Sequence, residues 1–265
     1  MQKLFFLSGL PRTGTTVLGN ILNQNPDIHV SSTSGLLEFL YHVNEVYLNI
    51  TDRYIDVDPK QFINVSDSIV KSWYKHVDKK YIIDKWRGWM NNLPQIVEVI
   101  NNNPKIICTY RPVEEVLVSF IDLLDKDRNN FIDSELTKRN LEITNINRSL
   151  FLLNEGVVGE TIEFISNTFH KYGDKILYIS YDDIVTDTEN TLKKIETYLE
   201  IGHYENYSLT DIDTSVNDND FYWGIKELHN IRPVVGKKSK DPKEYFDSDF
   251  LQYLQSINSK IEFLF

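Results

Sequence analysis

An arginine and three threonines occupy a short glycine-rich loop near the start of the chain, and these side chains bind anions. The loop is Gly9-Leu-Pro-Arg-Thr-Gly-Thr-Thr16. The apolar run of residues 3–7 before it has the pattern of a buried strand, and the residues after it have helical spacing. Backbone N–H groups at such a helix start have no partners of their own and point at one place. The loop therefore predicts an anion site, in which Arg12 supplies charge and the threonines supply hydroxyl donors.

The spacing of this loop nearly matches the nucleotide-binding pattern G-x-x-x-x-G-K-[ST]. Gly9 and Gly14 fill the two glycine positions, and Thr16 fills the Ser/Thr position. Thr15 stands where the pattern has the lysine that reaches the β- and γ-phosphates. The loop therefore favours a ligand with a different charged end group. A plain turn between a strand and a helix is the alternative, but it gives no reason for an arginine and three threonines.

A second candidate phosphate site follows the apolar run of residues 105–110. Arg111 ends this predicted strand, and Ser119 lies about two turns into the predicted helix that follows. A guanidinium and a hydroxyl that converge at a strand end can bind a second phosphate, the guanidinium bidentately. Pairing of Arg111 with Glu114 or Glu115 explains the arginine equally well when the segment is taken alone.

Asp84 and Lys85 end another predicted buried strand, which begins at Tyr81. Open α/β sheets bind ligands at the carboxyl ends of their strands. Lys85 could therefore donate to a transferring group while Asp84 holds it in place. A surface ion pair is the alternative, and the acidic strand end could also be the magnesium-holding strand of a nucleotide hydrolase.

Two further segments carry candidate ligand groups. Tyr181 follows an apolar run and could stack on a base, although core packing is the better interpretation of an isolated aromatic residue. Lys237, Lys238 and Lys240 follow Gly236 in a polar stretch. These lysines could close over a phosphate, although a solvated cluster is favoured when they are taken alone.

The pattern of elements predicts the α/β fold class. Short apolar runs alternate with amphipathic stretches, which predicts a P-loop-like parallel β-sheet flanked by helices on both faces. Two helical stretches, at residues 36–50 and 58–76, interrupt this alternation and are predicted to form a cap or one wall of a cleft. A long helix or helix pair is predicted over residues 137–171. A final helix is predicted at residues 249–262.

Length and charge limit the classes of partner. The chain has 265 residues and a net charge of -11, which makes nucleic acid and anionic membranes poor partners. Its one cysteine, Cys108, lies in an apolar run and is predicted to be a buried thiol. No basic-then-apolar leader precedes the first strand, and no apolar run is long enough to span a bilayer. We therefore expect a soluble, cytoplasmic protein with one domain over residues 1–265, in which residues 36–78 are a helical insertion.

Taken together and in this order, these segments resemble the sulfotransferase superfamily. The loop of residues 9–16 is similar to the family's 5′-phosphosulfate loop, and the segment of residues 111–119 resembles its 3′-phosphate motif. Tyr181-Asp-Asp-Ile-Val is similar to the family's Tyr-Glu-Asp-Leu segment, and Asp84-Lys85 resembles the strand end that carries the family's lysine. The resemblance covers most of the chain. The form of the loop is closer to the bacterial and tyrosylprotein branches than to the cytosolic small-molecule enzymes.

The resemblance implies 3′-phosphoadenosine-5′-phosphosulfate (PAPS) as the sulfuryl donor, a hydroxyl or amine as the acceptor, and no metal. Arg12, Lys85 and the loop amides would stabilise the negative charge that grows during transfer. The donor-binding residues that it implies are Pro11, Arg12, Thr13, Gly14, Thr15 and Thr16 for the 5′-phosphosulfate, Arg111 and Ser119 for the 3′-phosphate, Tyr181 for the adenine, and Gly236, Lys237 and Lys238 in a loop that closes over the donor.

The acceptor side of the sequence departs from the family. Neither the histidine of the cytosolic enzymes nor the glutamate of the tyrosylprotein enzymes has a counterpart at the corresponding position. Glu38, His29 and Asp84 are therefore the candidates for the base that takes the acceptor's proton. A P-loop nucleotide kinase or hydrolase, with Thr16 and Asp84 around magnesium, is one alternative, although it would need the lysine that position 15 lacks. A non-catalytic PAPS- or nucleotide-binding module is the alternative from another class.

Overall fold

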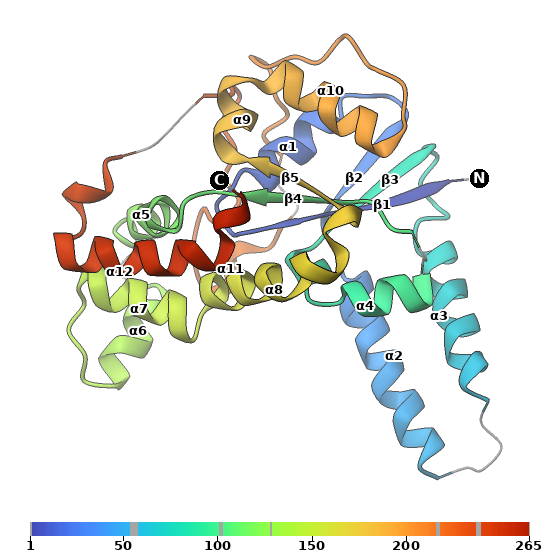
Figure 1. Ribbon diagram of the computed structural model, residues 1–265, viewed down its shortest axis with the longest axis horizontal. Helices are drawn as coiled ribbons and strands as arrows, with labels where there is room; N and C mark the ends of the chain where they lie inside the picture. Colours follow the sequence, from blue (N-terminus) through green and yellow to red (C-terminus); the bar gives the residue numbers. More distant parts are fainter. Residues whose placement is uncertain are drawn as a thin grey trace.

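A parallel sheet forms the centre of the molecule. The computed structural model describes residues 2–53, 58–100, 103–127, 129–215, 218–236 and 240–264. Its strands are β1 (Lys3–Gly9), β2 (Ile28–Thr33), β3 (Tyr81–Lys85), β4 (Ile106–Tyr110) and β5 (Ile176–Ser180). Within the described residues they form one sheet in the order β2-β3-β1-β4-β5, and every neighbouring pair is parallel (Figure 1). The carboxyl ends of β3, β1 and β4 therefore lie side by side.

Each side of the sheet has its own apolar core, because successive strand residues face opposite sides. Phe5 of β1 and Ile83 of β3 are buried on one side, and Phe6 and Ile82 are buried on the other. Cys108 of β4 lies on the second side, where it is fully buried as predicted, and burial raises the pKa of its thiol. Burial on both faces explains why β1, β3 and β4 are largely apolar runs.

Helices cover both faces of the sheet, as predicted. The helices α1, α9 and α10 pack on the side of Phe5, and α4, α7, α8 and α12 lie on the other side (Figure 1). The helices are α1 (Thr15–Leu22), α2 (Leu36–Thr51), α3 (Pro59–Trp73), α4 (Leu93–Gln95), α5 (Val113–Leu124), α6 (Phe131–Lys138), α7 (Asn145–Asn154), α8 (Val157–Tyr172), α9 (Tyr181–Thr186), α10 (Thr188–Leu199), α11 (Asp220–Trp223) and α12 (Ser248–Asn258). Shorter or irregular helical turns are η1 (Arg87–Trp89), η2 (Ile96–Ile100), η3 (Gly173–Lys175), η4 (Pro242–Glu244) and η5 (Ser259–Leu264).

The long helix or helix pair predicted over residues 137–171 is a pair, α7 and α8, and the stretch also contains the last two residues of α6. Asn130 caps α6 with its side chain, so the first helix begins before the predicted stretch. Thr144 caps α7 in the same way, and Gly156 precedes α8. The short helix α9 was also missed; the side chain of Ser180, the last residue of β5, caps it. These local helix starts divide a stretch of continuous apolar spacing into separate helices.

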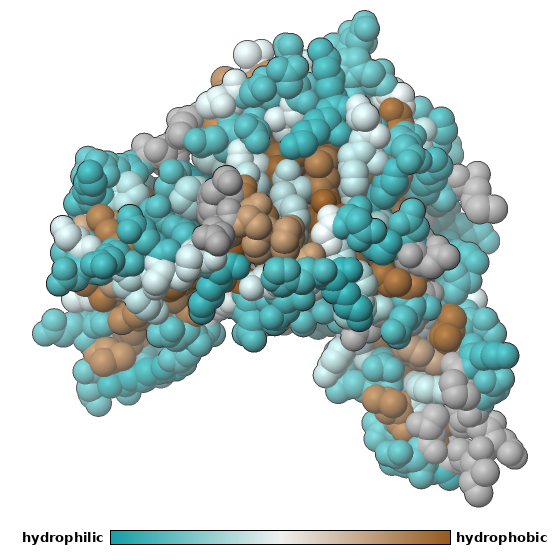
Figure 2. All heavy atoms as spheres, viewed as in Figure 1, coloured by the Kyte–Doolittle hydropathy of each residue, from teal (hydrophilic) through white to brown (hydrophobic). Residues whose placement is uncertain are grey.

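The helices α2 and α3 form a hairpin that projects away from the sheet (Figure 1). Leu36 and Val70 are buried at its base, whereas Val46, Leu48 and Val65 are exposed along its length. Figure 2 shows apolar side chains on this projecting part of the surface. No helix among the described residues is both long and apolar enough to cross a membrane. A role for this hairpin as a cap, and the assignment of the chain to a single domain, stay predictions.

Candidate active site

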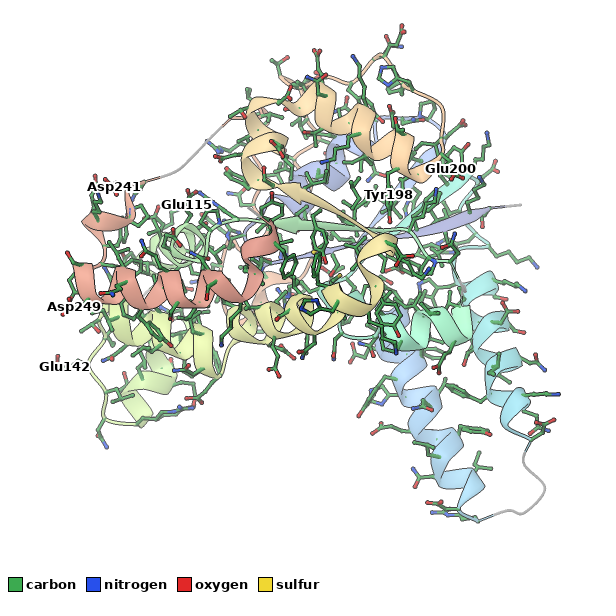
Figure 3. All side chains as sticks on the ribbon, viewed as in Figure 1. Glu115, Glu142, Tyr198, Glu200, Asp241 and Asp249 are labelled. Carbon is green, nitrogen blue, oxygen red and sulfur yellow. The ribbon has the colours of Figure 1, made fainter. Side chains whose placement is uncertain are left out.

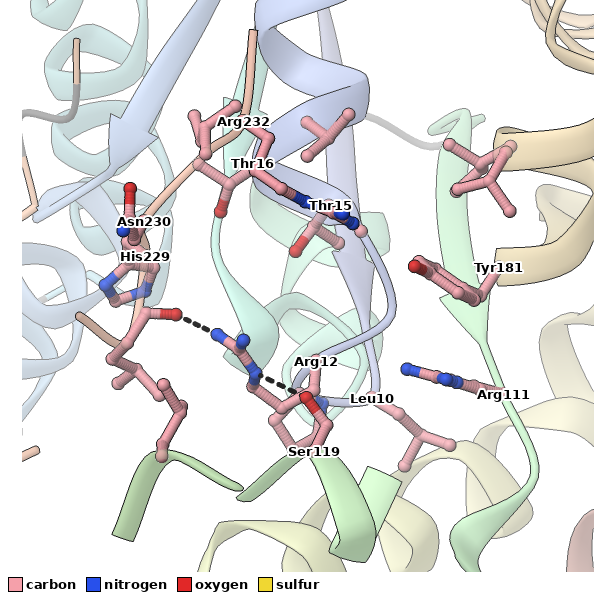
Figure 4. Close-up of a pocket in the computed structure, with 18 of the residues that line it drawn as sticks. Leu10, Arg12, Thr15, Thr16, Arg111, Ser119, Tyr181, His229, Asn230 and Arg232 are labelled. Atoms are coloured by element: carbon pink, nitrogen blue, oxygen red, sulfur yellow. Dashed lines mark hydrogen bonds between the residues drawn. The ribbon is translucent and has the colours of Figure 1, made fainter. Parts of the chain in front are cut away.

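The ends of β1, β3 and β4 open into a cavity of about 340 Å³. Small-molecule sites have volumes of about 300–1,000 Å³, so the cavity is large enough for such a ligand. One side, which we call the strand-end wall, consists of residues 9–16 and 109–119. The opposite side is lined from residues 227–236, and we call the segment of residues 218–236 that contains them the C-terminal wall (Figure 4).

The loop of the strand-end wall is fixed by a close approach to β4. Gly9 has a φ of 147°, and a Cβ on it would lie 2.3 Å from Thr109 Oγ1 and 2.4 Å from the Thr109 carbonyl oxygen. Thr13 Oγ1 donates to the Leu10 carbonyl at 2.5 Å and lies 2.6 Å from Thr109 Oγ1. The Thr13 hydroxyl therefore holds the loop against the sheet and does not line the cavity.

Arg12 joins the two walls. Its backbone has a φ of 64°, a left-handed conformation that non-glycine residues rarely adopt. Its Nε donates to Ser119 Oγ of α5 at 3.2 Å, and its Nη1 donates to the Leu228 carbonyl of the C-terminal wall (Figure 4). Burial, together with the positive charge of Arg111, lowers the pKa of the Arg12 guanidinium to about 10. Arg12 is still charged at neutral pH, and a bound anion would relieve the repulsion between the two arginines.

Arg111 lies at the far end of the strand-end wall, next to Tyr181 of α9. The Arg111 guanidinium carbon lies 4.2 Å from the centroid of the Tyr181 ring, and Arg111 Nε donates to Glu115 Oε2 at 2.8 Å. The Tyr181 ring also packs beside Gly14, where an added Cβ would meet it at 3.3 Å. The ion pair that sequence analysis left as an alternative is therefore present, and Arg111 and Tyr181 line the cavity as well.

Lys85 lies at the end of β3, between the two walls. Its Nζ is 3.0 Å from Asp218 Oδ2 and 3.5 Å from Thr16 Oγ1. Asp218 Oδ1 also accepts from the Thr33 backbone N–H at 2.7 Å. Burial opposes ionisation of Asp218, but Lys85 and the hydrogen bonds outweigh it, so the pKa of this carboxyl is below its usual value. The side chains of Lys85 and Asp218 are only 9% and 3% exposed, which makes this a buried ion pair.

The three residues predicted as the acceptor base do not line the cavity. Asp84 faces the opposite side of the sheet from Lys85, where it accepts from Tyr74 Oη at 2.6 Å and from Trp89 Nε1 at 2.9 Å. Burial raises the pKa of the Asp84 carboxyl against the effect of these hydrogen bonds. Glu38 is exposed on α2, and His29 is partly exposed on β2, with a pKa lowered by burial. A catalytic role for these three residues stays a prediction to which the geometry adds no support.

Most of the predicted donor-binding residues are brought together. Those that line the cavity are Pro11, Arg12, Gly14, Thr15, Thr16, Arg111, Ser119, Tyr181 and Gly236, and Lys85 lines it as well. Thr13 is buried behind the loop. Lys237 and Lys238 lie outside the described residues, whereas Lys240 of the same predicted cluster lines the cavity and its Nζ donates to Asp122 Oδ1 at 2.6 Å.

The cavity is cationic although the chain is acidic. Among the described residues that line it, seven are Arg or Lys and three are Asp or Glu, whereas the whole chain has a net charge of -11. Acidic residues such as Glu142, Glu200, Asp241 and Asp249 lie exposed at the edges of the molecule (Figure 3). This segregation of charge favours an anionic ligand in the cavity.

Apart from Gly236, which was predicted, the C-terminal wall is the part of the site that sequence analysis missed. His229, Asn230 and Arg232 line the cavity from this wall (Figure 4). Asp218 approaches from the same wall and holds Lys85. The available signal was a histidine and an arginine close together in a polar stretch without periodicity, and such a stretch has no spacing that predicts where its side chains point.

Solved structures share this fold. The sulfotransferase domain from the curacin biosynthetic pathway is 15% identical, with a TM-score of 0.56 over 98% of this chain and 97% of that one. The sulfotransferase from Alicyclobacillus acidocaldarius is 12% identical, with a TM-score of 0.54 over 100% of this chain and 96% of that one. Mouse sulfotransferase SULT7A1, complexed with PAP, is 18% identical, with a TM-score of 0.56 over 98% of this chain and 84% of that one. At these identities the likeness shows the fold alone.

Nothing among the curated protein sequences matches the chain. The model of the Sulfotransferase family, in contrast, matches residues 5–205. The match covers more than half of the chain and includes the whole strand-end wall. The resemblance inferred from the sequence is thereby confirmed, and the chain belongs to the sulfotransferase family.

Proposed function

We propose that this chain transfers the sulfuryl group of PAPS to a hydroxyl or amine acceptor. The observation that carries the proposal is the convergence of two anion-binding segments on one cavity. Arg12, in the loop after β1, donates to Ser119 of α5 across 3.2 Å, and Arg111 lines the same cavity. Two phosphate-binding segments on one cavity suit a ligand with a charged group at each end. The PAP in the complex of mouse SULT7A1 is such a ligand.

The start of α1 is suited to the 5′-phosphosulfate. Gly14 is the N-cap residue, in a left-handed conformation with a φ of 81°, and the helix has no side-chain cap. The first N–H groups of a helix have no intrahelical partners, so they can donate to an anion. The hydroxyls of Thr15 and Thr16 lie at the same helix start, and Arg232 lies over them from the C-terminal wall (Figure 4).

Arg111 and Ser119 are suited to the 3′-phosphate. A guanidinium has five N–H donors, so Arg111 can keep its contact with Glu115 and also bind a phosphate. We assign the adenine to the neighbourhood of Tyr181, whose aromatic ring packs between Gly14 and Arg111.

Arg12 and Lys85 would stabilise the transition state of the transfer. Negative charge grows on the bridging oxygen as the sulfur–oxygen bond to the 5′-phosphate breaks. Cations that are already fixed in position stabilise such charge without reorganising during the reaction. Asp218 holds Lys85 at 3.0 Å, and Ser119 and Leu228 hold Arg12, so both cations are fixed in this way.

A magnesium-dependent nucleotide hydrolase fits the geometry less well. Asp84 was the acidic residue proposed to hold the cation with Thr16, but it is bound to Tyr74 and Trp89 on the other side of the sheet. Thr15 also stands in place of the lysine of that pattern.

Calorimetry tests the donor. We expect PAP to bind in the presence of EDTA, and to bind at least about tenfold more tightly than ATP does with magnesium. The substitution Arg111→Ala should weaken PAP binding by about 10–100-fold, because a charged hydrogen-bonding partner contributes about 1.5–3 kcal/mol. Adenosine 5′-phosphate lacks the 3′-phosphate, so the same variant should change its affinity by no more than about twofold.

Arg139→Ala is the matched control, because Arg139 forms an exposed ion pair with Glu155 and does not line the cavity. Equal losses for PAP and adenosine 5′-phosphate in Arg111→Ala would exclude the 3′-phosphate role. Tight, magnesium-dependent binding of ATP would exclude PAPS as the donor. Turnover of ³⁵S-labelled PAPS with a panel of phenols, sugars, lipids and peptides then separates an enzyme from a binding module.

A further inference from the structure

A histidine–carboxylate pair faces the cavity from the C-terminal wall. His229 lines the cavity, and its Nδ1 lies 2.6 Å from Asp220 Oδ1. The backbone N–H of His229 donates to the other oxygen, Asp220 Oδ2, at 3.3 Å. The carboxylate therefore holds both the main chain and the ring of the same residue. This double contact fixes the orientation of the imidazole.

The pair also fixes which ring nitrogen can take a proton. A carboxylate only accepts hydrogen bonds, so Nδ1 of His229 carries the proton that Asp220 binds. Nε2 of the neutral ring is then an acceptor. Its neighbour is Asp218 Oδ2, at 4.0 Å, which is too far for a hydrogen bond but close enough to stabilise a positive charge on the ring.

Asp218 connects Nε2 of His229 to the groups that we assign to the sulfuryl group. The carboxylate of Asp218 also binds Lys85 Nζ at 3.0 Å, and that amine is 3.5 Å from Thr16 Oγ1 at the start of α1. Arg12 donates to the carbonyl of Leu228, the residue next to His229. Figure 4 shows that His229, Arg12 and Thr16 border the same part of the cavity. The charged groups around the imidazole are thus Asp220 and Asp218 of its own wall and Lys85 and Arg12 of the facing elements.

We propose that Nε2 of His229 is the general base that accepts the proton of the sulfuryl acceptor, and that Asp220 is the positioning residue for its ring. This inference rests on the proposed function. In the step, the acceptor oxygen or nitrogen forms a bond to sulfur while the sulfur–oxygen bond to the 5′-phosphate breaks. PAP leaves with the electron pair of that bond. The acceptor proton passes to Nε2, and solvent removes it from the imidazolium.

The tautomer of His229 tests the geometry without any acceptor. In ¹H–¹⁵N correlation spectra of the full chain, we expect Nδ1 of neutral His229 to be protonated and Nε2 to be bare. In Asp220→Asn, the backbone N–H of His229 still needs an acceptor, so the oxygen of the new side-chain amide turns toward it. The NH₂ of that amide then faces Nδ1 of His229. The proton should then move to Nε2. A wild-type ring protonated at Nε2 would overturn the proposal.

Turnover tests the proton transfer. With ³⁵S-labelled PAPS, and with water, phenols, sugars and amines as acceptors, His229→Gln should release or transfer sulfate about 10²–10⁴ times more slowly. Asp220→Asn should be slowed as well, because its histidine has the wrong tautomer. The affinity for PAP should stay within about twofold in both variants, since neither side chain is assigned to the donor.

His203→Gln is the matched control. His203 Nδ1 lies 2.5 Å from Glu196 Oε2, so it is also a histidine–carboxylate pair, but it does not line the cavity. Wild-type turnover by His229→Gln would overturn the base and leave the PAPS proposal intact. A wild-type protein that binds no PAP would instead overturn the proposed function, and the base with it.

Discussion

The strand-end wall and the C-terminal wall face the same cavity, but the chain builds them in different ways. The strand-end wall consists of two strand ends, each followed by a helix, and the backbone of Gly9 packs directly on Thr109. The C-terminal wall contains, in its described residues, only the short helix α11. It is held by contacts across the cavity, such as Asp218 with Lys85 and the Leu228 carbonyl with Arg12, and by the burial of Ile225, Leu228 and Ile231 in the two apolar cores.

The two walls are therefore stabilised by different kinds of interaction. The shape of the strand-end wall depends on backbone packing, which ionic conditions hardly change. The C-terminal wall depends on the buried Lys85–Asp218 ion pair as well as on apolar packing, so its stability changes with pH and with the loss of a single charged partner. Under the two proposals, donor binding depends mainly on the strand-end wall and proton transfer on the C-terminal wall. Substitutions in the two walls should therefore have different effects.

The largest effect should come from disturbing the backbone packing of the strand-end wall. In Gly9→Ala, the new Cβ would lie within 2.7 Å of three atoms of Thr109, and the φ of 147° suits only glycine. Overpacking and backbone strain together predict a loss of about 3–5 kcal/mol in the free energy of unfolding. Urea denaturation followed by tryptophan fluorescence measures this loss.

Gly202→Ala is the control for this substitution, because an added Cβ there meets nothing within 4 Å. We expect it to change the free energy of unfolding by less than about 0.5 kcal/mol. A similar small effect in Gly9→Ala would show that the strand-end wall does not depend on the close approach to β4.

The same difference explains what could be predicted from the sequence. The loop of residues 9–16 could be identified because its strand, glycines and helix start are adjacent in the chain. The C-terminal wall could not, because its contacts join distant segments: Asp218 and Lys85 are 133 residues apart, and Leu228 and Arg12 are 216 residues apart. His229 therefore stood in an irregular stretch that gave no indication of its partners.

Asp84 and Lys85 illustrate the same limit within two adjacent residues. Both could be assigned to a strand end, and both were expected at the site. Successive strand residues face opposite sides of the sheet, however, so only one of the two can face α1. The apolar run before them did not indicate which, because the strand is buried on both sides.

The second largest effect should come from the ion pair of the C-terminal wall. Asp218→Asn leaves Lys85 buried without its carboxylate, which should lower the free energy of unfolding by about 3 kcal/mol at neutral pH. The folded pKa of Asp218 is lowered, so its contribution is present above the unfolded value of 3.8 and is lost as pH falls through the folded pKa. The difference between wild type and variant should therefore shrink in acid.

Denaturation of both proteins across a pH series, with Asp211→Asn as an exposed control from the same part of the chain, measures this dependence. A difference that does not change with pH would mean that the carboxylate charge of Asp218 does not hold this wall.

The smallest effect, and the opposite pH dependence, should come from Asp84. Burial raises the folded pKa of this carboxyl, so its contribution to stability is present below the unfolded value of 3.8 and is lost as pH rises through the folded pKa. Asp84→Asn keeps an oxygen that can accept from Tyr74 or Trp89, and it cannot ionise. We therefore expect it to destabilise the protein by about 1 kcal/mol in acid and by less as the pH rises.

Asp84→Asn and Asp218→Asn should thus diverge, although both carboxylates lie close to Lys85 in the fold. The affinity of Asp84→Asn for PAP should stay within about twofold of wild type, because Asp84 does not line the cavity. If its destabilisation instead grows with pH, as expected for Asp218→Asn, then Asp84 is ionised and its hydrogen bonds outweigh burial. A loss of PAP affinity in Asp84→Asn would mean that the side of the sheet facing Tyr74 also contributes to the site, and the division of the site into two walls would then be incomplete.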